Sequence, residues 1–344
     1  LTTLFLAEPD RVPLAELAVH RDVKKAFMGK PVSDLKTEVE FCIAAGADFV
    51  PLLAGVFRRG NIPRQSSRKT SFRYSLYQGD SATTRNWVEE GRGVITGHEE
   101  FEKFSWPVAD DIDCSEYETI KSYLPSGMKV VASNGFIFDA VNRLMGTENF
   151  FLSLMNKQDL VERMFEKIGN LQYRLIERIC EYDCVGAVWM ADDVAYAESL
   201  MVSPKILKKY LFPWYKKIGN LCRAKNLAYL YHSDGNLWEV MEDIVDAGFN
   251  ALHPIEPKAM DIKEVKEKFG HRLCLIGNID LGYTLTRGTP QEVEEEVRQR
   301  IRDIAPGGGY CVSSSNSITE YVPLDNFKAM MEATLKHGSY PINC

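Results

Sequence analysis

The segment YLYHSDGN (229–236) sets the fold of this chain, because it begins as an apolar run and ends in the polar side chains of His232 and Asp234. A buried parallel strand is a continuous apolar run, and barrel enzymes carry their chemistry at the C-terminal ends of such strands. Four other segments follow the same rule: AVWMADD (187–193), LHPIEP (252–257), CLIGNID (274–280) and YCVSSSNS (310–317). Five such units in series predict an α/β fold, a (β/α)8 TIM barrel with a carboxylate-rich mouth.

Helices are expected between these strands, because apolar residues recur there at helical spacing. The helix at 203–226 has Ser203 as its N-cap and is expected to kink at Pro213. The helix at 289–305 begins at Thr289, with acidic residues in its first turn. Strands and helices that alternate with right-handed crossovers produce a parallel sheet.

The first half of the chain is less regular. Residues 12–19 and 47–55 both have the pattern of barrel strands, and we assign 12–19 as the first one. The segments 73–80 and 94–100 are expected to form a hairpin instead. We therefore interpret residues 57–127, approximately, as an insert that forms a lid over the barrel mouth.

Composition limits the class of protein. The 344 residues are enough for one barrel with insertions, so we expect a single domain over 1–344. The net charge of −7 argues against a nucleic-acid partner. The N-terminal stretch lacks the pattern of a signal peptide, and we find no apolar stretch of about 20 residues, so we expect a cytoplasmic protein without a membrane partner. The eight scattered cysteines are expected to be reduced thiols.

Five strand-end residues are candidates for catalysis: Asp192, Asp193, His232, Asp234 and Glu256. Adjacent strand residues point to opposite faces, so only one of Asp192 and Asp193 is expected to face the barrel axis. The alternative is that both are structural, one as the cap of the following helix and the other in an ion pair. His232 and Asp234 share one side of their strand end, which suits either an acid–base pair or two ligands of a metal site. Glu256, between two prolines, either positions a ligand or caps the next helix.

Five further residues near strand ends are candidates for substrate binding: Asn134, Tyr196, Asn278, Asp280 and Asn316. His253 lies inside its strand and is expected to be a core or wall residue. The predicted insert also carries basic and aromatic residues, which would contact an anionic or aromatic substrate, dock an acidic partner or lie in solvent. They are Arg58, Arg59, Arg64, Arg68, Lys69 and Arg73 with Phe57, Phe72, Tyr74, Tyr77 and Trp87.

The chain lacks a GxSxG elbow, an HExxH helix, a Walker A loop and a Rossmann fingerprint, which argues against hydrolase, zincin and nucleotide-dependent classes. Its motifs instead resemble the uroporphyrinogen decarboxylase superfamily, over most of the sequence and most strongly from 187 to 333. The motifs that carry the resemblance are ADDVAY, YLYHSDGN, LHPIEP spaced to LIGNID, RGTPQEV, PGGGYCVSSSNSI and VPLDNFKAM. This superfamily includes porphyrinogen decarboxylases and corrinoid-linked methyltransferases, so the fold alone does not settle the activity.

Two departures from the superfamily patterns narrow what the resemblance implies. The decarboxylases carry an N-terminal arginine-rich signature that grips substrate carboxylates, whereas this chain has LAELAVHRDVKKAF near that point. The thiol-methylating members hold zinc with a His-x-Cys motif and a later Cys. Here the first motif is His232-Ser233-Asp234, and Asn316 takes the place of the later Cys, so both thiolate ligands of zinc are missing. A harder His–carboxylate metal site at His232 and Asp234, or no metal, stays open.

The resemblance then favours the substrate-side methyltransferase of O-demethylase systems. This implies transfer of a methyl group from a methoxylated substrate, an aryl methyl ether above all, to the cob(I)alamin of a separate corrinoid protein. The difficult part of that chemistry is the leaving oxygen, which needs a proton or electrostatic stabilisation. Three alternatives stay open: a decarboxylase of a porphyrinogen or other carboxylate, a non-catalytic binding protein, and a metal-dependent methyltransferase for a nitrogen or sulfur donor.

Overall fold

A computed structural model describes residues 1–53, 69–74, 83–88 and 93–342, with backbone alone for 69–74, 83–88 and Asn134. The chain forms two compact units. The first comprises 1–54, 113–135 and 176–344, and the second comprises 55–112 and 136–175. The expectation of a single domain over 1–344 stays a prediction.

The first unit is built on a parallel sheet of seven strands. In spatial order these are β1 (Phe49–Leu53), β4 (Lys129–Gly135), β5 (Val185–Ala191), β6 (Ala228–His232), β7 (Ala251–His253), β8 (Cys274–Ile279) and β9 (Tyr310–Ser314). All neighbours pair in parallel, so every strand ends at the same edge of the sheet. The fold is therefore α/β and TIM-barrel-like, as the strand-end pattern predicted.

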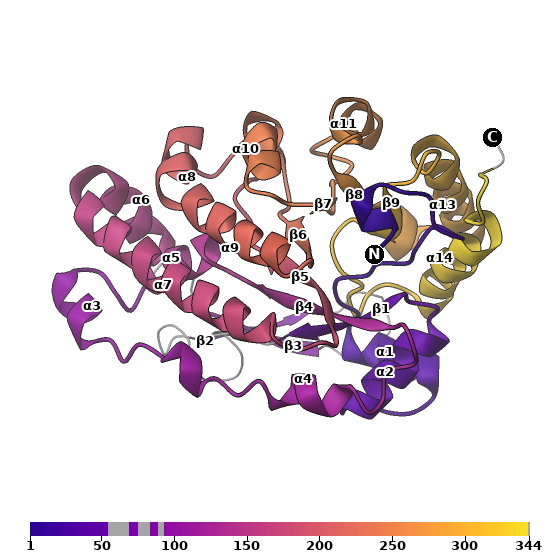
Figure 1. Cartoon of the computed structure of the whole chain (residues 1–344), viewed down its shortest axis with the longest axis horizontal. Helices are drawn as coiled ribbons and strands as arrows, with labels where there is room; N and C mark the ends of the chain where they lie inside the picture. The colour runs from indigo at the N-terminus through magenta and orange to yellow at the C-terminus, as the bar shows by residue number, and fades with distance from the viewer. Residues whose placement is uncertain (54–68, 75–82, 89–92, 343–344) are drawn as a thin grey trace. The chain divides into compact units, whose positions relative to one another are not determined.

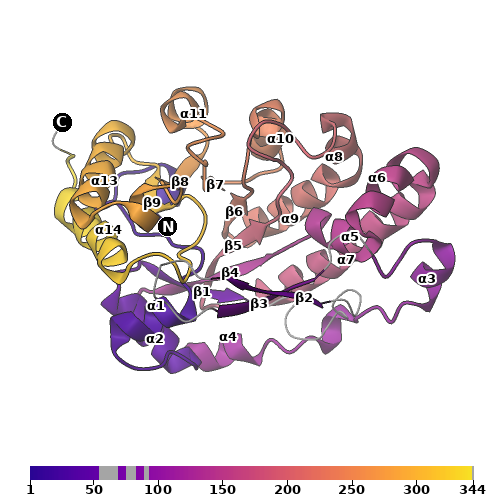
Figure 2. The ribbon, with the colours of Figure 1, turned by 180° about the vertical axis from the view of Figure 1, so that it is seen from behind.

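Helices cover the outer side of this sheet in Figures 1 and 2. In the first unit they are α1 (Arg21–Met28), α2 (Leu35–Ala44), α4 (Ser115–Ile120), α8 (Pro204–Tyr210), α9 (Phe212–Ala224), α10 (Met241–Asp246), α11 (Ile262–Phe269), α12 (Thr284–Arg287), α13 (Pro290–Ile304) and α14 (Leu324–His337), with the short helix η3 (Trp238–Val240). The short helix η1 (Thr3–Phe5) instead contacts β8 and β9, and its Leu4 packs on the inner face of the sheet. The break between α8 and α9 falls at Leu211, just before Pro213, where a kink was predicted. Thr289 and Glu292 form a capping box that fixes the start of α13.

The second unit contains the antiparallel pair β2 (Lys69–Tyr74) and β3 (Thr83–Val88), with α3 (His98–Lys103), η2 (Ala109–Asp111), α5 (Phe138–Met145), α6 (Thr147–Asn156) and most of α7 (Gln158–Ile179). A hairpin was predicted in this region, but its second strand is at 83–88. The segment 94–100 instead leads into α3, because Glu99 and Glu100 suit a first helical turn rather than a strand. The basic and aromatic side chains at 57–87 lie outside the described residues.

Alternation along the strands separates an inner face from an outer one. The inner faces of β4 to β9 contribute one buried apolar cluster: Val131, Ala187, Trp189, Ala228, Leu230, Ala251, Cys274, Ile276 and Cys311, joined by Ala15. Full burial of an aliphatic side chain of this kind stabilises a fold by about 1.5–3 kcal/mol. Continuing the same alternation past the cluster brings Asp193, His232, His253 and Ser313 to the C-terminal edge of the inner face.

Residues 12–19 are not a regular strand, which corrects the assignment of a first barrel strand there. The segment runs parallel to β9 but forms only isolated bridges, Leu14 with Val312 of β9 and Val19 with Ile318 beyond its end. Between these bridges the carboxylate of Glu16 accepts the backbone N–H of Ser314 and interrupts the backbone ladder. Next to this point, Leu14 N donates to Asp48, directly before β1 (3.2 Å).

The seven cysteines of the described residues are free and buried, and their redox state stays a prediction. None of the helices in the described ranges combines the length and apolar character that crossing a membrane requires.

Candidate functional site

Two adjacent strand ends bring three of the candidate catalytic residues together. Asp193 follows β5, His232 ends β6, and Asp234 lies two residues further along the same side of the chain. His232 Nε2 is 3.6 Å from Asp193 Oδ1 and 3.8 Å from Asp234 Oδ1. We call these three residues the mouth cluster.

The loops that carry the mouth cluster are fixed by backbone contacts. Asp234 N donates to Asp193 Oδ1 (2.9 Å), and Asn236 N donates to the carbonyl of Tyr196 (2.9 Å). Gly235 has φ +87°, and a Cβ there would lie 2.5 Å from the Tyr196 carbonyl oxygen. Only glycine fits this close approach without strain. The HSDG sequence therefore positions Asp234 as well as supplying it.

Asp192 faces away from the mouth cluster, as the alternation predicted for one of the two adjacent aspartates. Its side chain is 1% exposed and accepts a hydrogen bond from the Tyr215 hydroxyl of α9 at 2.7 Å. The Tyr231 hydroxyl donates to its backbone carbonyl at 3.0 Å. Asp192 thus anchors the end of β5 to the helical layer, while Asp193 turns toward His232.

Asp234 is the carboxyl group of the cluster whose ionisation is most strongly perturbed. Burial, followed by the charges of Asp193 and Glu256, raises its pKa to about 7, and a hydrogen bond from Asn316 acts in the opposite direction. Asn316 Nδ2 donates to Asp234 Oδ2 (2.5 Å), whereas Oδ1 has no hydrogen-bond partner among the described residues. Asp234 therefore exchanges a proton near neutral pH at the oxygen that faces His232.

His232 is held from behind by a second histidine. Its Nδ1 is 2.6 Å from Nδ1 of His253, and His253 Nε2 is 3.2 Å from the Ser313 hydroxyl. Burial lowers the pKa of His232, against the raising effect of Asp193. Burial and then His232 lower the pKa of His253 far more. Both imidazoles are thus neutral at pH 7, and one ring donates to the other through its Nδ1–H.

The remaining candidate residues lie at other strand ends of the first unit. Glu256 is half-buried, and its charge reaches Asp234. Asn278 is buried and donates to the Ile255 carbonyl (2.5 Å), so it braces the HPIEP loop. The Asp280 carboxylate accepts from Gly282 N and Tyr283 N, both at 2.8 Å, and holds the loop after β8.

Two candidates for substrate binding lie on the loop after β5 and near the end of β4, without a described side-chain contact to the mouth cluster. Tyr196 is 57% exposed on the loop after β5, where its backbone rather than its side chain makes the contacts described above. Asn134 lies near the end of β4, paired with Met190 of β5, and its side chain lies outside what the structure describes. Roles for both in substrate binding stay predictions.

The mouth cluster fits a divalent cation. One ligand atom from each of Asp193, His232 and Asp234 lies within 4.8 Å of the others. A cation about 2.1 Å from each ligand separates neighbouring ligand atoms by roughly 3.0–3.5 Å, somewhat less than the 3.6 and 3.8 Å from His232 Nε2 to the two carboxylates, so the side chains would close slightly around it. The group contains two carboxylates and an imidazole but no thiolate, which suits a harder cation than a zinc that activates thiols.

Three residues that bear on this site were not singled out as functional from sequence. His253 was expected to be a wall residue, and neither Ser313 nor Glu16 was considered. Each is a polar residue at a buried position. Glu16 interrupts the apolar run VPLAELAV, which was an available signal, whereas Ser313 begins the polar run SSSNS and does not stand out.

We compared the fold and the sequence of this chain with those of known proteins to identify its family. A methyltransferase from Methanosarcina mazei has the same fold, with a TM-score of 0.67 and 18% identity over 98% of this chain and 97% of that one. Among curated proteins, the methylcobamide:CoM methyltransferase MtaA of Methanosarcina barkeri is 25% identical over 194 residues, 55% of this chain and 53% of the relative. A uroporphyrinogen decarboxylase of Actinobacillus succinogenes is 30% identical over 109 residues, 32% of this chain and 29% of the relative.

The chain thus spans about half the length, or less, of these curated relatives. The sequence profile of the uroporphyrinogen decarboxylase (URO-D) family, by contrast, matches residues 115–337 without interruption. That range holds β4 to β9 together with the mouth cluster, His253 and Ser313. The chain belongs to the uroporphyrinogen decarboxylase (URO-D) family.

Proposed function

We propose that this chain is a corrinoid-dependent methyltransferase of the URO-D family that demethylates a methoxylated substrate, an aryl methyl ether above all. The methyl group passes to the cob(I)alamin of a separate corrinoid protein, which supplies the methyl-accepting cobalt. The chain itself would bind the methoxylated substrate and activate its oxygen at the mouth cluster. The likeness to MtaA, a methylcobamide:CoM methyltransferase, supports the methyltransferase half of this proposal.

The observation that carries the proposal is the state of Asp234. When the methyl–oxygen bond breaks, the electron pair stays on oxygen, and the leaving phenolate or alkoxide needs a proton or a positive charge. Asp234 has a pKa raised to about 7, so it keeps a proton at neutral pH that an ordinary aspartate would have lost. Its unpartnered Oδ1 presents that proton on the side of His232.

The other residues of the site would hold substrate and charge in place. Asn316 fixes Oδ2 of Asp234 and so turns Oδ1 toward the substrate oxygen. Asp193 and Glu256 favour the protonated form of Asp234 by their charges. Asn278 and Asp280 keep the neighbouring loops rigid. Tyr196 and Asn134 are our candidates for contacts to the substrate ring.

A divalent cation is the alternative source of positive charge at the same place. Asp193, His232 and Asp234 would hold it, and it would act as a Lewis acid on the substrate oxygen. Binding of such a cation would displace the proton of Asp234, because a metal ligand must be deprotonated.

A porphyrinogen decarboxylase is the weaker proposal. The side chains that gather at the described mouth are acidic or neutral: Asp193, His232, Asp234, Glu256 and Asn316. A substrate with many carboxylates would be repelled by these carboxylates. The decarboxylase would need cationic side chains from the insert at about 57–127, which we propose forms a lid over a closed (β/α)8 barrel.

A methyl-transfer assay tests the proposal. The purified protein, cob(I)alamin (free or on a corrinoid protein) and a panel of methoxylated aromatics are mixed without oxygen, and the cob(I)alamin absorbance is followed. We expect its loss only when this protein and one class of donor are present. Turnover of a porphyrinogen carboxylate, with no loss of cob(I)alamin signal for any ether, would instead establish the decarboxylase.

A further inference from the structure

A chain of buried polar groups runs from the mouth cluster to a carboxylate on the far side of β9. It comprises His232, His253, Ser313 and Glu16, from three strands and the segment 12–19. His253 and Ser313 are fully buried, and His232 and Glu16 are 6% and 9% exposed. Buried polar groups of this kind are almost always hydrogen-bonded, so each donor in the chain requires an acceptor.

Glu16 is the acceptor end of this chain. Its Oε1 accepts the backbone N–H of Ser314 and its Oε2 accepts the Ser314 hydroxyl at 2.9 Å. The Ser313 side chain also acts on the Glu16 carboxyl as a donor that lowers its pKa, more weakly than the two groups of Ser314. At pH 8, above its raised pKa of about 7, the Glu16 carboxylate is ionised and only accepts hydrogen bonds, so the single proton of the Ser313 hydroxyl points toward Glu16.

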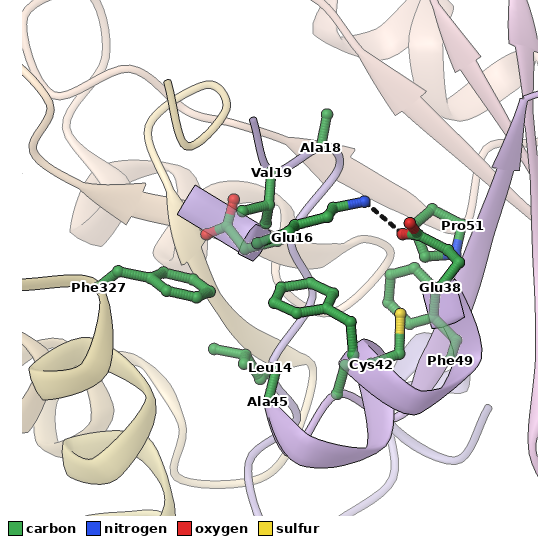
Figure 3. A pocket seen from close by; sticks show the side chains of 13 residues that line it. Leu14, Glu16, Ala18, Val19, Glu38, Cys42, Ala45, Phe49, Pro51 and Phe327 are labelled. Carbon is green, nitrogen blue, oxygen red and sulfur yellow. Dashed lines mark hydrogen bonds and ion pairs between the residues drawn. The ribbon is translucent and has the colours of Figure 1, made fainter. Parts of the chain in front are cut away.

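The surroundings of Glu16 leave hydrogen bonds as the main compensation for its charge. Figure 3 shows the side chain at a small cavity that Glu38, Cys42 and Phe327 also line. The cavity measures about 30 Å³, which holds one or two waters. Lys24, the basic residue among those that line it, is paired with Glu38 instead. The donors on Glu16 are therefore those of Ser313 and Ser314.

The direction of each remaining hydrogen bond follows from that acceptor. Because the Ser313 hydroxyl donates to Glu16, its oxygen accepts from His253 Nε2–H. A backbone hydrogen bond with Ser314 that raises the pKa of His253 also favours a proton on this ring. The neutral His253 then has a bare Nδ1, which accepts the Nδ1–H of His232 across 2.6 Å. The neutral His232 is left with a bare Nε2.

We propose that Glu16, acting through Ser313 and His253, fixes the tautomer of His232 so that Nε2 presents a lone pair to Asp193 and Asp234. Glu16, Ser313 and His253 are then positioning residues for a site they do not touch. Three electron-pair donors meet at the mouth, and the group that satisfies them is a proton on Asp234 or a divalent cation. The part of this inference that concerns the cation rests on the proposed function, whereas the tautomer does not.

The tautomer can be observed directly. Protein labelled with 15N-histidine is examined at pH 8 by long-range 1H–15N correlation, with the His232 signals assigned from a His232→Gln variant. We expect a protonated Nδ1 and an unprotonated Nε2 in the metal-free protein. A protonated Nε2 on His232 would overturn the inference, whatever the protein does with cob(I)alamin.

Two neighbouring serines on β9 provide a matched pair of variants. Ser313→Ala removes the hydroxyl that links His253 to Glu16, so we expect the two tautomers of His232 to mix. We also expect Co²⁺ affinity, followed by the visible d–d absorption, to fall about 10- to 100-fold. Ser314 is as buried as Ser313, but Ser314→Ala leaves the link from His253 through Ser313 to Glu16 intact. The tautomer of His232 and the Co²⁺ affinity should therefore stay within about twofold of the wild-type values. Equal behaviour of the two variants would overturn the inference.

Glu16→Gln keeps the shape of the side chain. Its amide can donate to Ser313, which would reverse the direction of each hydrogen bond from there to His232. It provides a second variant if Ser313→Ala fails to fold, and we expect a protonated Nε2 on His232. An unchanged tautomer would exclude the role of Glu16. If the tautomers are as expected but the protein fails to methylate cob(I)alamin, the proposed function is wrong and this inference still holds.

Discussion

The Nδ1 atoms of His232 and His253 lie 2.6 Å apart, at the ends of the neighbouring strands β6 and β7. Both rings are buried and neutral, so one proton lies between these atoms and each ring has one further nitrogen. The pair turns Nε2 of His232 toward Asp193 and Asp234 and Nε2 of His253 toward β9. His253, which is buried like a core residue, thus orients the imidazole of His232 at the mouth.

Asp234→Asn is expected to lower the rate of cob(I)alamin methylation by about 10²- to 10³-fold, the range for loss of a general acid. An acid acts in its protonated form. With a pKa raised to about 7, the wild-type rate should therefore fall as pH rises through 7. In the variant, this inflection should disappear.

The control is Glu198→Gln, which removes an exposed carboxylate from the loop after β5. Its rate and pH profile should match those of the wild type. A wild-type profile that is flat between pH 6 and 8 would refute the role of Asp234 as the acid.

Glu16→Gln is expected to flatten the pH dependence of stability. Burial raises the pKa of Glu16 to about 7 from 4.5, so the folded protein binds this proton more tightly than the unfolded chain. The associated stability is fully present below pH 4.5 and is lost as pH rises through 7. A shift of this size corresponds to about 3 kcal/mol.

Urea unfolding of both proteins at several pH values between 4.5 and 8 measures this difference. Asp234 contributes a slope of the same sign, so the comparison uses the difference between wild type and variant rather than either curve. Lys24 and Glu38, which line the same cavity, are present in both. Parallel curves would show that Glu16 has an ordinary pKa.

Tyr215→Phe is expected to destabilise the first unit more than Tyr231→Phe. The Tyr215 hydroxyl donates to the buried carboxylate of Asp192, whereas the Tyr231 hydroxyl donates to its backbone carbonyl. Hydrogen bonds to charged groups contribute about 1.5–3 kcal/mol, against about 1 kcal/mol for neutral partners. Denaturant unfolding of the two variants, which lose the same atom, measures the difference. A larger loss for Tyr231→Phe would mean that Asp192 is protonated.

His232→Ala is expected to weaken Co²⁺ or Zn²⁺ binding by about 100-fold, because it removes the nitrogen ligand of the mouth cluster. Isothermal titration of the metal-free protein measures the affinity. His98→Ala is the control, since His98 is half-exposed in the second unit and pairs with Asp159. Equal affinities in the two variants would place the metal elsewhere.

The sequence was sufficient for the parallel sheet because periodicity and strand-end polarity are local properties. It was insufficient at the segment 12–19, where an apolar run predicted a strand. There the Glu16 carboxylate competes with the backbone for Ser314 N–H, and this competition depends on a residue almost 300 positions away. The second strand of the hairpin was misplaced for the same reason, because the partner of a strand is decided by contacts between segments and not by the pattern within one segment.

At the site, the sequence determined that one of Asp192 and Asp193 shares a face with His232 and Asp234 at the strand ends, since alternation in a strand is fixed by backbone geometry. It could not determine that Asp192 turns to Tyr215 of α9, that burial and neighbouring charges raise the pKa of Asp234, or that His253 meets His232. Those facts depend on distances between residues far apart in the chain and on how completely water is excluded. Both are set only when the strands and helices pack.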